Sequence, residues 1–322
     1  MRVLFIIPGE EQGNSMIFAK RQLKSLQASK IEADGFYLSS RTNPFVMWSE
    51  FRRFRKKLSE FKPDLIHVHY GTMTAFFAAY SNLKPLVITY HGSDLNYLKD
   101  ESLLKEIFRK ILSQLAALRS SQIICVSEAL KSKLWWKKSS VSIMPMGVNT
   151  DVFKPMDRAD AQRKSGIKES EKVIIFNHNN AAVKRLDIAE MAIKEVKEAL
   201  PESRLYVLNG GVQQDEMVAL LSASDCLLMC SDSEGSPTLI KEAMACNLPI
   251  VATDVGDIKQ TIDQTSPYFI TEQNPTALSK CLKKILASPT RSNGRNRVFE
   301  LKIDEQSLTL KLINLYQNLI RR

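Results

Sequence analysis

The segment SEGSPTLIKEAMACNLPIVATDVG, residues 233–256, joins two glutamates, a Gly-x-Pro turn and the start of a helix. The apolar run at 226–230 before it predicts a strand, Ser236 is expected to cap the helix, and Pro237 suits its first turn. The helix is predicted to continue through 238–245. Its first amides have no partner inside the helix, and they lie at the positive end of the helix dipole. The segment therefore predicts a phosphate site at a helix N-terminus.

The spacing of Glu234 and Glu242, with seven residues between them, resembles the signature of the GT4-type (group 1) retaining glycosyltransferases with a GT-B fold. The similarity continues at 242–245, at 249–253 and at Gly256. The resemblance implies that Glu234 hydrogen-bonds the donor sugar, that Glu242 binds the ribose, and that the residues between them hold the diphosphate. The residues implied to hold the diphosphate are Gly235, Ser236, Pro237, Thr238 and Leu239. The alternative is a capped surface helix with two solvated glutamates.

Length and patterning predict two domains. A chain of 322 residues exceeds the size at which one core keeps growing. Strands alternate with helices in both halves, which indicates two Rossmann-like α/β domains with parallel sheets, and the GT-B resemblance implies that they face an interdomain cleft. The expected strands are 3–7, 65–68, 86–89 and 122–126, then 173–176, 204–208, 226–229 and 250–252, and the second half has helices near 187–200, 215–222 and 238–245.

The segment 144–155, rich in proline and turn formers, is predicted to be the linker. We place an acceptor-side domain at 1–149 and a nucleotide-sugar-binding domain at 150–322, with the last helix as a candidate to pack back on the first domain. The five cysteines lie mostly in apolar runs and are expected to be buried thiols in a reducing compartment. The sequence contains no run of about 18 apolar residues. We therefore expect a cytoplasmic protein, or one that is peripheral on the inner face of the plasma membrane.

Ligands of doubly wound sheets bind outside the carboxyl ends of the strands, so functional motifs are expected just after strands. After the first strand, Gly13 leads into a helix at about Ser15 and is a candidate for a phosphate contact, with an ordinary turn as the alternative. After strand 86–89, Tyr-His-Gly-Ser-Asp at 90–94 is similar to the family's His-Gly-x-Asp-type loop at the donor sugar, which makes His91 a candidate catalytic residue. His67 and His69 share one face of a strand, and packing is favoured over a metal site.

The loop after strand 173–176 ends in Lys184 and Arg185. In the family an Arg and, several residues later, a Lys neutralise the diphosphate leaving group. Lys184 matches the Lys, whereas His178 or Asn179 stands where the Arg is expected, so Arg185 is the substitute if the loop turns it inward. A solvated helix start is the alternative. Beyond the next strand, Gly211 and Val212 are expected to line the nucleobase with backbone groups, which leaves a UDP- or GDP-sugar open as the donor.

The net charge is +10, and basic residues cluster. Residues 51–58 resemble a basic amphipathic helix, and 134–138 set Trp135 and Trp136 beside two lysines. Both suit an anionic membrane. Charge alone suits nucleic acid almost as well, but no nucleic-acid motif accompanies it, and a solvated basic face is the other alternative.

The resemblance implies a hexosyltransferase that moves a sugar from a nucleotide-diphosphate sugar to a hydroxyl of a glycan or glycolipid acceptor and retains anomeric configuration, and we expect it to serve bacterial cell-surface polysaccharide or lipopolysaccharide synthesis. The resemblance implies that the diphosphate accepts the proton of the attacking hydroxyl. No Asp-x-Asp occurs, so neither a metal nor another cofactor is implied. The alternatives are a nucleotide-sugar epimerase or hydrolase of the same fold, and a non-catalytic subunit that binds sugar nucleotide.

Overall fold

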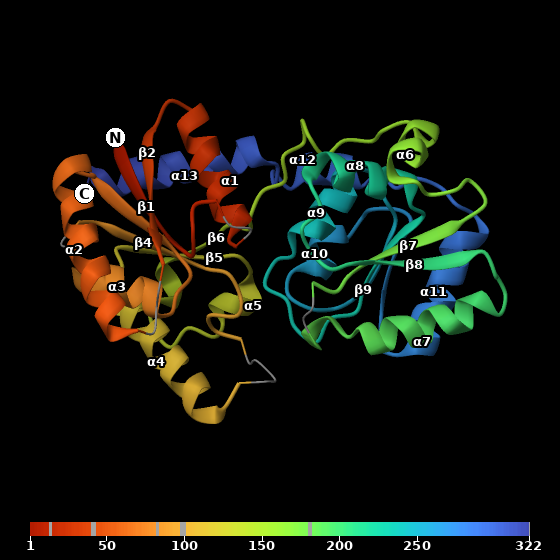
Figure 1. Ribbon diagram of the computed structural model, residues 1–322, viewed down its shortest axis with the longest axis horizontal. Helices are drawn as coiled ribbons and strands as arrows, with labels where there is room; N and C mark the ends of the chain where they lie inside the picture. Colours follow the sequence, from red (N-terminus) through yellow and green to blue (C-terminus); the bar gives the residue numbers. More distant parts are fainter. Residues whose placement is uncertain (13–14, 40–42, 82–83, 97–100, 180–181, 322) are drawn as a thin grey trace. The chain divides into compact units, whose positions relative to one another are not determined.

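The computed structural model describes the chain apart from residues 13–14, 40–42, 82–83, 97–100, 180–181 and 322. It divides into two compact units (Figure 1). Unit 1 contains Met1–Met146 and Glu305–Arg322, and unit 2 contains Gly147–Asp304. The chain thus passes from unit 1 to unit 2 inside the Pro-rich segment and returns for its last helix.

Unit 1 is built on a six-stranded parallel sheet in the order β2-β1-β3-β4-β5-β6. Its central strands are apolar and buried on both faces, as a parallel sheet covered by helices requires. The strands are β1 (Arg2–Pro8), β2 (Glu32–Leu38), β3 (Leu65–His69), β4 (Leu86–Tyr90), β5 (Gln122–Cys125) and β6 (Val141–Ile143).

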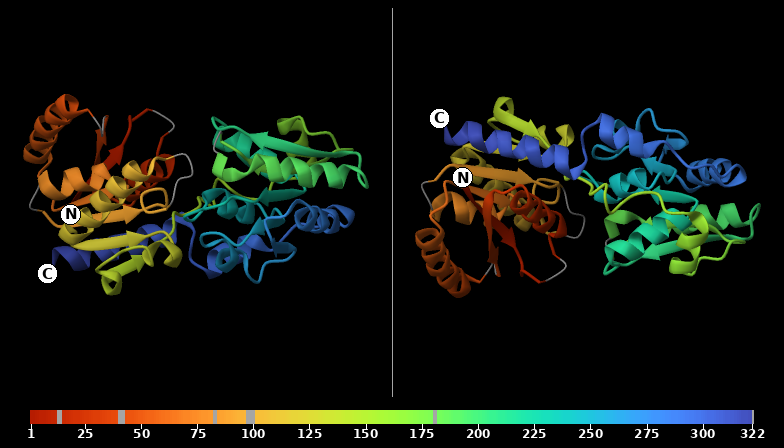
Figure 2. Two further views of the ribbon diagram at one scale, coloured as in Figure 1. Left: turned by 90° about the horizontal axis from the view of Figure 1, so that it is seen from below. Right: turned by 90° about the horizontal axis from the view of Figure 1, so that it is seen from above.

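Helices cover both faces of this sheet (Figure 1). One face carries α1 (Ile17–Ala28) and α13 (Glu305–Ile320), which pack on each other. The other carries α2 (Pro44–Phe61), α3 (Met73–Ser81) and α4 (Leu103–Arg119), with the short α5 (Glu128–Lys131) after β5. Two further views show α13 running along unit 1 (Figure 2).

Unit 2 repeats this plan with a five-stranded parallel sheet in the order β11-β10-β9-β7-β8. Within it α7 packs on α11, α6 on α8, and α9 on α12. The strands are β7 (Lys172–Asn177), β8 (Ser203–Leu208), β9 (Cys226–Met229), β10 (Ile250–Thr253) and β11 (Tyr268–Thr271), and the helices are α6 (Arg158–Ser165), α7 (Leu186–Lys197), α8 (Gln214–Ala223), α9 (Thr238–Ala245), α10 (Ile258–Ile262), α11 (Pro275–Ala287) and α12 (Gly294–Glu300).

The predicted α/β class with two Rossmann-like domains is confirmed, and all eight predicted strands are present. The three strands that were not predicted, β2, β6 and β11, all lie at a sheet edge. All three are partly exposed; β2 and β6 have no continuous apolar run, and that of β11 is limited to residues 268–270. In both sheets the strand order reverses once, between β1 and β3 and between β7 and β9, and a doubly wound sheet binds its ligand at such a point.

The cysteines behave as expected of apolar side chains. Cys125, Cys226, Cys230 and Cys246 are buried and Cys281 is half-buried. Burial raises the pKa of the Cys230 and Cys246 thiols to about 12, so both stay protonated. Within the described parts of the chain, every helix is too short or too polar to cross a bilayer.

Candidate functional site

The reversal point of the unit 2 sheet brings together two of the predicted catalytic residues. Lys184 lies in the loop after β7 and Glu234 in the loop after β9, and Lys184 Nζ donates to Glu234 Oε1 at 2.6 Å. Both side chains are largely shielded, at 16% and 11% exposure. A backbone bond from Asp232 N to Val183 O, 2.8 Å long, ties the two loops together. A cation and a carboxylate are therefore held side by side where a ligand is expected.

Arg185 adopts a left-handed backbone, with φ of +58°, at the start of α7. Its guanidinium bonds both carboxylate oxygens of Asp187, at 2.9 and 2.8 Å, and Asp232 Oδ1 at 3.1 Å. These bonds raise its pKa further above the usual range of arginine. Two carboxylates thus balance the charge of Arg185, which weakens its candidacy as the replacement for the family arginine.

The start of α9 differs from the prediction at Ser236. Pro237, not Ser236, is the N-cap residue, and the Ser236 hydroxyl donates to the Asp257 carboxylate instead of accepting a helix amide. Lys241 Nζ donates to Ser236 Oγ at 2.6 Å and to the Ser236 carbonyl oxygen at 3.3 Å. The predicted cap was wrong because hydrogen bonds with charged partners outcompete one with a backbone amide.

The loop before α9 is packed against Gly256. A Cβ atom at this glycine would lie 2.8 Å from the Gly235 carbonyl oxygen and 3.0 Å from that of Glu234. Its φ of +64° is also unfavourable for any other residue. Glu242 is buried on α9, at 8% exposure. The predicted residues Gly235, Ser236, Pro237, Thr238 and Leu239 directly follow Glu234 in the chain, and Glu242 lies further along α9.

The glycines after β8 leave backbone exposed. Gly210 and Gly211 have φ of +90° and +77°, and a Cβ at Gly211 would meet no atom within 4 Å. The amides of His178 and Asn179 both donate to the Leu208 carbonyl, at 3.0 and 2.9 Å. This contact sets the loop after β7 against the end of β8. Val212, the other residue expected at the nucleobase, is half-buried beside Gly211.

In unit 1, the loop after β4 is organised by Asp94. Its buried carboxylate accepts the amides of Gly71 at 3.0 Å, His91 at 2.9 Å and Gly92 at 2.8 Å. Burial raises the Asp94 pKa, and these amide bonds act in the opposite direction. The sequence indicated Asp94 only as a member of the loop motif, without a role of its own. The contact to Gly71, after β3, shows that it joins two loops. Gly13, the candidate in the loop after β1, lies outside the described residues.

The candidate His91 belongs to a group of three histidines. His91 Nε2 lies 3.0 Å from His69 Nδ1, and its ring packs on Phe18. His67 bonds Thr89 Oγ1 at 2.7 Å and the hydroxyl of Tyr316 on α13. Burial lowers the pKa of His67 and of His91 to about 3, so both rings are neutral at physiological pH. Among the described residues no cluster of His, Cys, Asp or Glu has a metal-binding arrangement.

The basic helix predicted at 51–58 is part of α2, and its five cations differ in environment. Arg53 bonds Glu50 and the Tyr37 carbonyl, and Lys57 bonds Asp34. Arg52, Arg55 and Lys56 are exposed. Trp135 is 58% exposed, whereas Trp136 is half-buried and donates its indole N–H to the Gln114 carbonyl at 2.9 Å.

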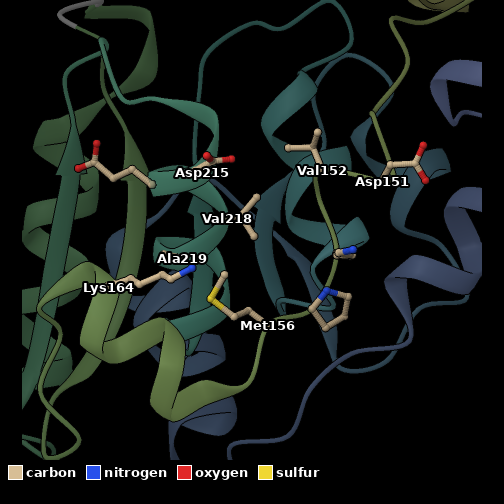
Figure 3. Close-up of a pocket in the computed structure, with 10 residues that line it drawn as sticks. Asp151, Val152, Met156, Lys164, Asp215, Val218 and Ala219 are labelled. Carbon is tan, nitrogen blue, oxygen red and sulfur yellow. The ribbon is translucent and has the colours of Figure 1, made fainter.

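Two of the cavities that described residues form lie in unit 2. One of 540 Å³ lies at the carboxyl ends of β9, β10 and β11 and reaches Asp232, the partner of Arg185. The other, of 740 Å³, lies between the end of the predicted linker, α6 and α8 (Figure 3). Asp151, Met156, Lys164 and Asp215 are among the residues that line it. None of the predicted donor-site residues lines this second cavity.

Comparisons with known proteins identify the family and the fold. The model of Glycosyltransferase Family 4 matches residues 15–152, and that of Glycosyl transferases group 1 matches residues 180–288. Similar proteins include N-acetyl-alpha-D-glucosaminyl L-malate synthase of Bacillus anthracis, 24% identical over 80% of this chain and 74% of that protein. A putative teichuronic acid biosynthesis glycosyltransferase, TuaC of Bacillus subtilis, is 25% identical over 71% of this chain and 62% of its own.

Solved structures share the fold. Sucrose-phosphate synthase from Thermosynechococcus elongatus superposes with a TM-score of 0.82 at 18% identity, over 99% of both chains. Anabaena Alr3699/HepE in complex with UDP-glucose gives a TM-score of 0.76 at 14% identity, over 99% of this chain and 100% of that one.

Proposed function

Because the chain belongs to the GT4-type glycosyltransferases with a GT-B fold, we propose that it transfers a hexose from a nucleoside diphosphate sugar to a hydroxyl of a glycan or glycolipid, with retention of anomeric configuration. One observation carries the proposal. Lys184, in the loop after β7, contacts Glu234, in the loop that leads into α9, at the sheet reversal point. This arrangement offers a cation, a carboxylate and a helix N-terminus to one ligand.

Each of these groups has a proposed part in the reaction. The bond between the anomeric carbon and the diphosphate breaks while the acceptor oxygen bonds to that carbon, and the acceptor proton passes to the departing diphosphate. Negative charge grows on the diphosphate during this step. Lys184 and the first amides of α9 stabilise that charge, which is usually a large catalytic contribution. Glu234 orients the sugar through its hydroxyls, and Glu242 binds the ribose.

The donor is proposed to be a UDP- or GDP-sugar, with no metal or other cofactor in the reaction. The Anabaena structure with UDP-glucose supports a nucleotide sugar in this fold and makes uridine donors the first to test. The TuaC relative supports a bacterial surface polysaccharide as the product class. His91 is proposed to contact the donor sugar from unit 1, as a neutral hydrogen-bonding group.

A product analysis tests the proposal. The protein is incubated with UDP- and GDP-hexoses and with bacterial lipid-linked glycans, and products are identified by mass spectrometry and by the proton coupling of the new anomeric centre. Transfer with the donor's own anomeric configuration is expected. An inverted product would refute retention. Free hexose alone, or an epimerised donor, would instead establish hydrolysis or epimerisation, and binding without any turnover would establish a non-catalytic subunit.

We also propose that unit 1 docks on an anionic membrane at the cytoplasmic face, where lipid-linked acceptors are available. The charge distribution supports this. Unit 1 has 25 basic and 13 acidic residues, a net charge of +12, whereas unit 2 has 20 basic and 22 acidic residues, a net charge of −2. Exposed aromatic side chains accompany the cations, with Phe45 at 88%, Trp48 at 60% and Trp135 at 58% exposure. Cations beside exposed aromatic residues are typical of peripheral membrane surfaces.

A further inference from the structure

Lys241 is a buried lysine in unit 2, with 1% of its surface exposed. A buried ammonium is costly unless polar partners compensate it. In the described structure, Lys241 Nζ donates to two oxygens of Ser236: the hydroxyl at 2.6 Å and the carbonyl oxygen at 3.3 Å. The hydroxyl in turn donates to Asp257, which lies between β10 and α10. Three segments are thus joined at the start of α9.

These bonds determine which backbone groups the start of α9 can present to a ligand. Ser236 directly precedes the N-cap residue Pro237, which has neither an amide hydrogen nor a side-chain acceptor. Within the described structure, α9 has no side-chain cap, so the amides of its first turn keep their hydrogens available. The Ser236 hydroxyl and carbonyl oxygen are both acceptors, and an acceptor that faces a phosphate repels it. Lys241 binds both of these oxygens.

We propose that Lys241 is a positioning residue of the donor-phosphate site: its ammonium turns the hydroxyl and carbonyl oxygens of Ser236 inward, so that amide hydrogens alone face the diphosphate. This inference rests on the proposed function, because it assumes a nucleoside diphosphate at α9. Asp257 completes the arrangement from the other side of the hydroxyl. The same loop lies so close to the neighbouring Gly256 that an added Cβ there would collide with the carbonyl oxygens of Glu234 and Gly235.

The apolar surroundings of α9 indicate that Lys241 has a functional role and does not merely fill space. Leu239, Ile240, Ala243, Met244 and Ala245 are all buried, so position 241 lies on a helix that is enclosed on every side. Leucine or methionine would fill this position without the cost of a buried charge. The lysine is explained if its positive charge is needed to hold the loop at Ser236, to which it is hydrogen-bonded.

The test is a double-mutant cycle with Lys241→Met and Ser236→Ala, read by calorimetry with UDP and GDP and by ligand-observed NMR with uridine and guanosine. Lys241→Met is expected to weaken binding of the nucleoside diphosphate roughly tenfold, the effect of one lost hydrogen bond to a charged group. Binding of the nucleoside is expected to stay within about twofold, because the phosphate contacts alone change. The double variant is expected to bind no more weakly than Lys241→Met, since both changes act on one contact.

Other outcomes overturn the inference in distinguishable ways. If the two losses multiply, Lys241 acts on the phosphate directly and not through Ser236. If nucleoside and nucleoside diphosphate binding fall together, Lys241 only maintains the fold, and unchanged diphosphate binding removes any role. Lys259→Met is the matched control, since Lys259 is an exposed lysine of α10 paired with Asp254, and it should bind as the wild type does. Wild-type protein that binds neither UDP nor GDP would refute the proposed function itself.

Discussion

Replacing Gly256 by alanine is expected to displace the loop that holds Glu234. The new Cβ atom would lie 2.8 Å from the Gly235 carbonyl oxygen, where 3.4 Å is an ordinary contact, so one of the two must move by about 0.6 Å. Two costs add. A left-handed backbone costs a residue other than glycine about 1–2 kcal/mol, and overpacking of this kind costs about 1–3 kcal/mol. The free energy of unfolding should therefore fall by about 2–5 kcal/mol.

Gly166 provides the matched control, because it separates these two costs. It caps α6 with φ of +71°, close to the +64° of Gly256, but an added Cβ would meet no atom within 4 Å. Gly166→Ala should lose only about 1–2 kcal/mol. Urea unfolding of both variants measures the difference, which is the steric cost at the loop.

The same pair of variants tests the site. A displacement of about 1 Å in a reacting group can lower a rate about 100-fold, so the smaller shift in Gly256→Ala should lower transfer about tenfold. Gly166→Ala should keep wild-type transfer. If the two variants are equally stable and equally active, the contact of Gly256 does not position Glu234, and the reasoning is wrong.

Four further predictions concern separate residues. Lys184→Ala should lower turnover by about 10²–10³, with a smaller change in donor affinity; wild-type turnover with a raised Michaelis constant would make Lys184 a plain binding residue. Glu242→Ala should weaken nucleoside diphosphate binding in calorimetry by about 1–3 kcal/mol, and unchanged affinity in a folded variant excludes the ribose role. Vesicles with anionic lipid should pellet the protein at low salt and less at high salt, because each exposed cation contributes about 1 kcal/mol. Replacing Arg52, Arg55 and Lys56 together by Gln should reduce pelleting. The matched control, in which Gln replaces Lys194, Lys197 and Lys280 of unit 2, should pellet as the wild type does. Equal pelleting with neutral and anionic vesicles would contradict docking by charge. His67 and His91, with folded-state pKa near 3, take up protons in the unfolded chain first, so stability should fall as the pH drops from about 6.5 toward 3. His67→Gln should flatten that slope in urea unfolding, by up to about 1.4 kcal/mol per pH unit, and an unchanged slope would show that His67 contributes nothing to it.

The sequence predicted the central strands and the donor segment because both have strong local signals. The buried strands are continuous apolar runs, and the segment at 233–256 combines a turn, a helix start and spaced glutamates. The edge strands β2 and β6 are partly exposed and lack such runs, and the run of β11 is limited to residues 268–270. Ser236 was misread because its partners Lys241 and Asp257 lie beyond the range of a local capping rule.

The buried lysine had a signal in the sequence that was not used. Residues 239–245 contain apolar side chains on every face of the helix, which predicts that the helix is enclosed and that Lys241 and Glu242 are buried with it. The contact between His67 and Tyr316 has no signal in the sequence, because 249 residues separate the two. The ties of Arg185 to Asp187 and Asp232 likewise depend on how two loops meet.

The return of α13 to unit 1 has a consequence for synthesis on the ribosome. The first 146 residues leave the ribosome early, but the site that receives α13 stays uncovered until Tyr316 reaches His67 and Glu305 reaches Ser25. Unit 2 is continuous from Gly147 to Asp304, so it has all of its residues before unit 1 does. Translation order and order of completion are therefore opposite for the two units. A nascent chain halted before α13 would expose the apolar face of α1 and its neighbours, which makes it a substrate for chaperones.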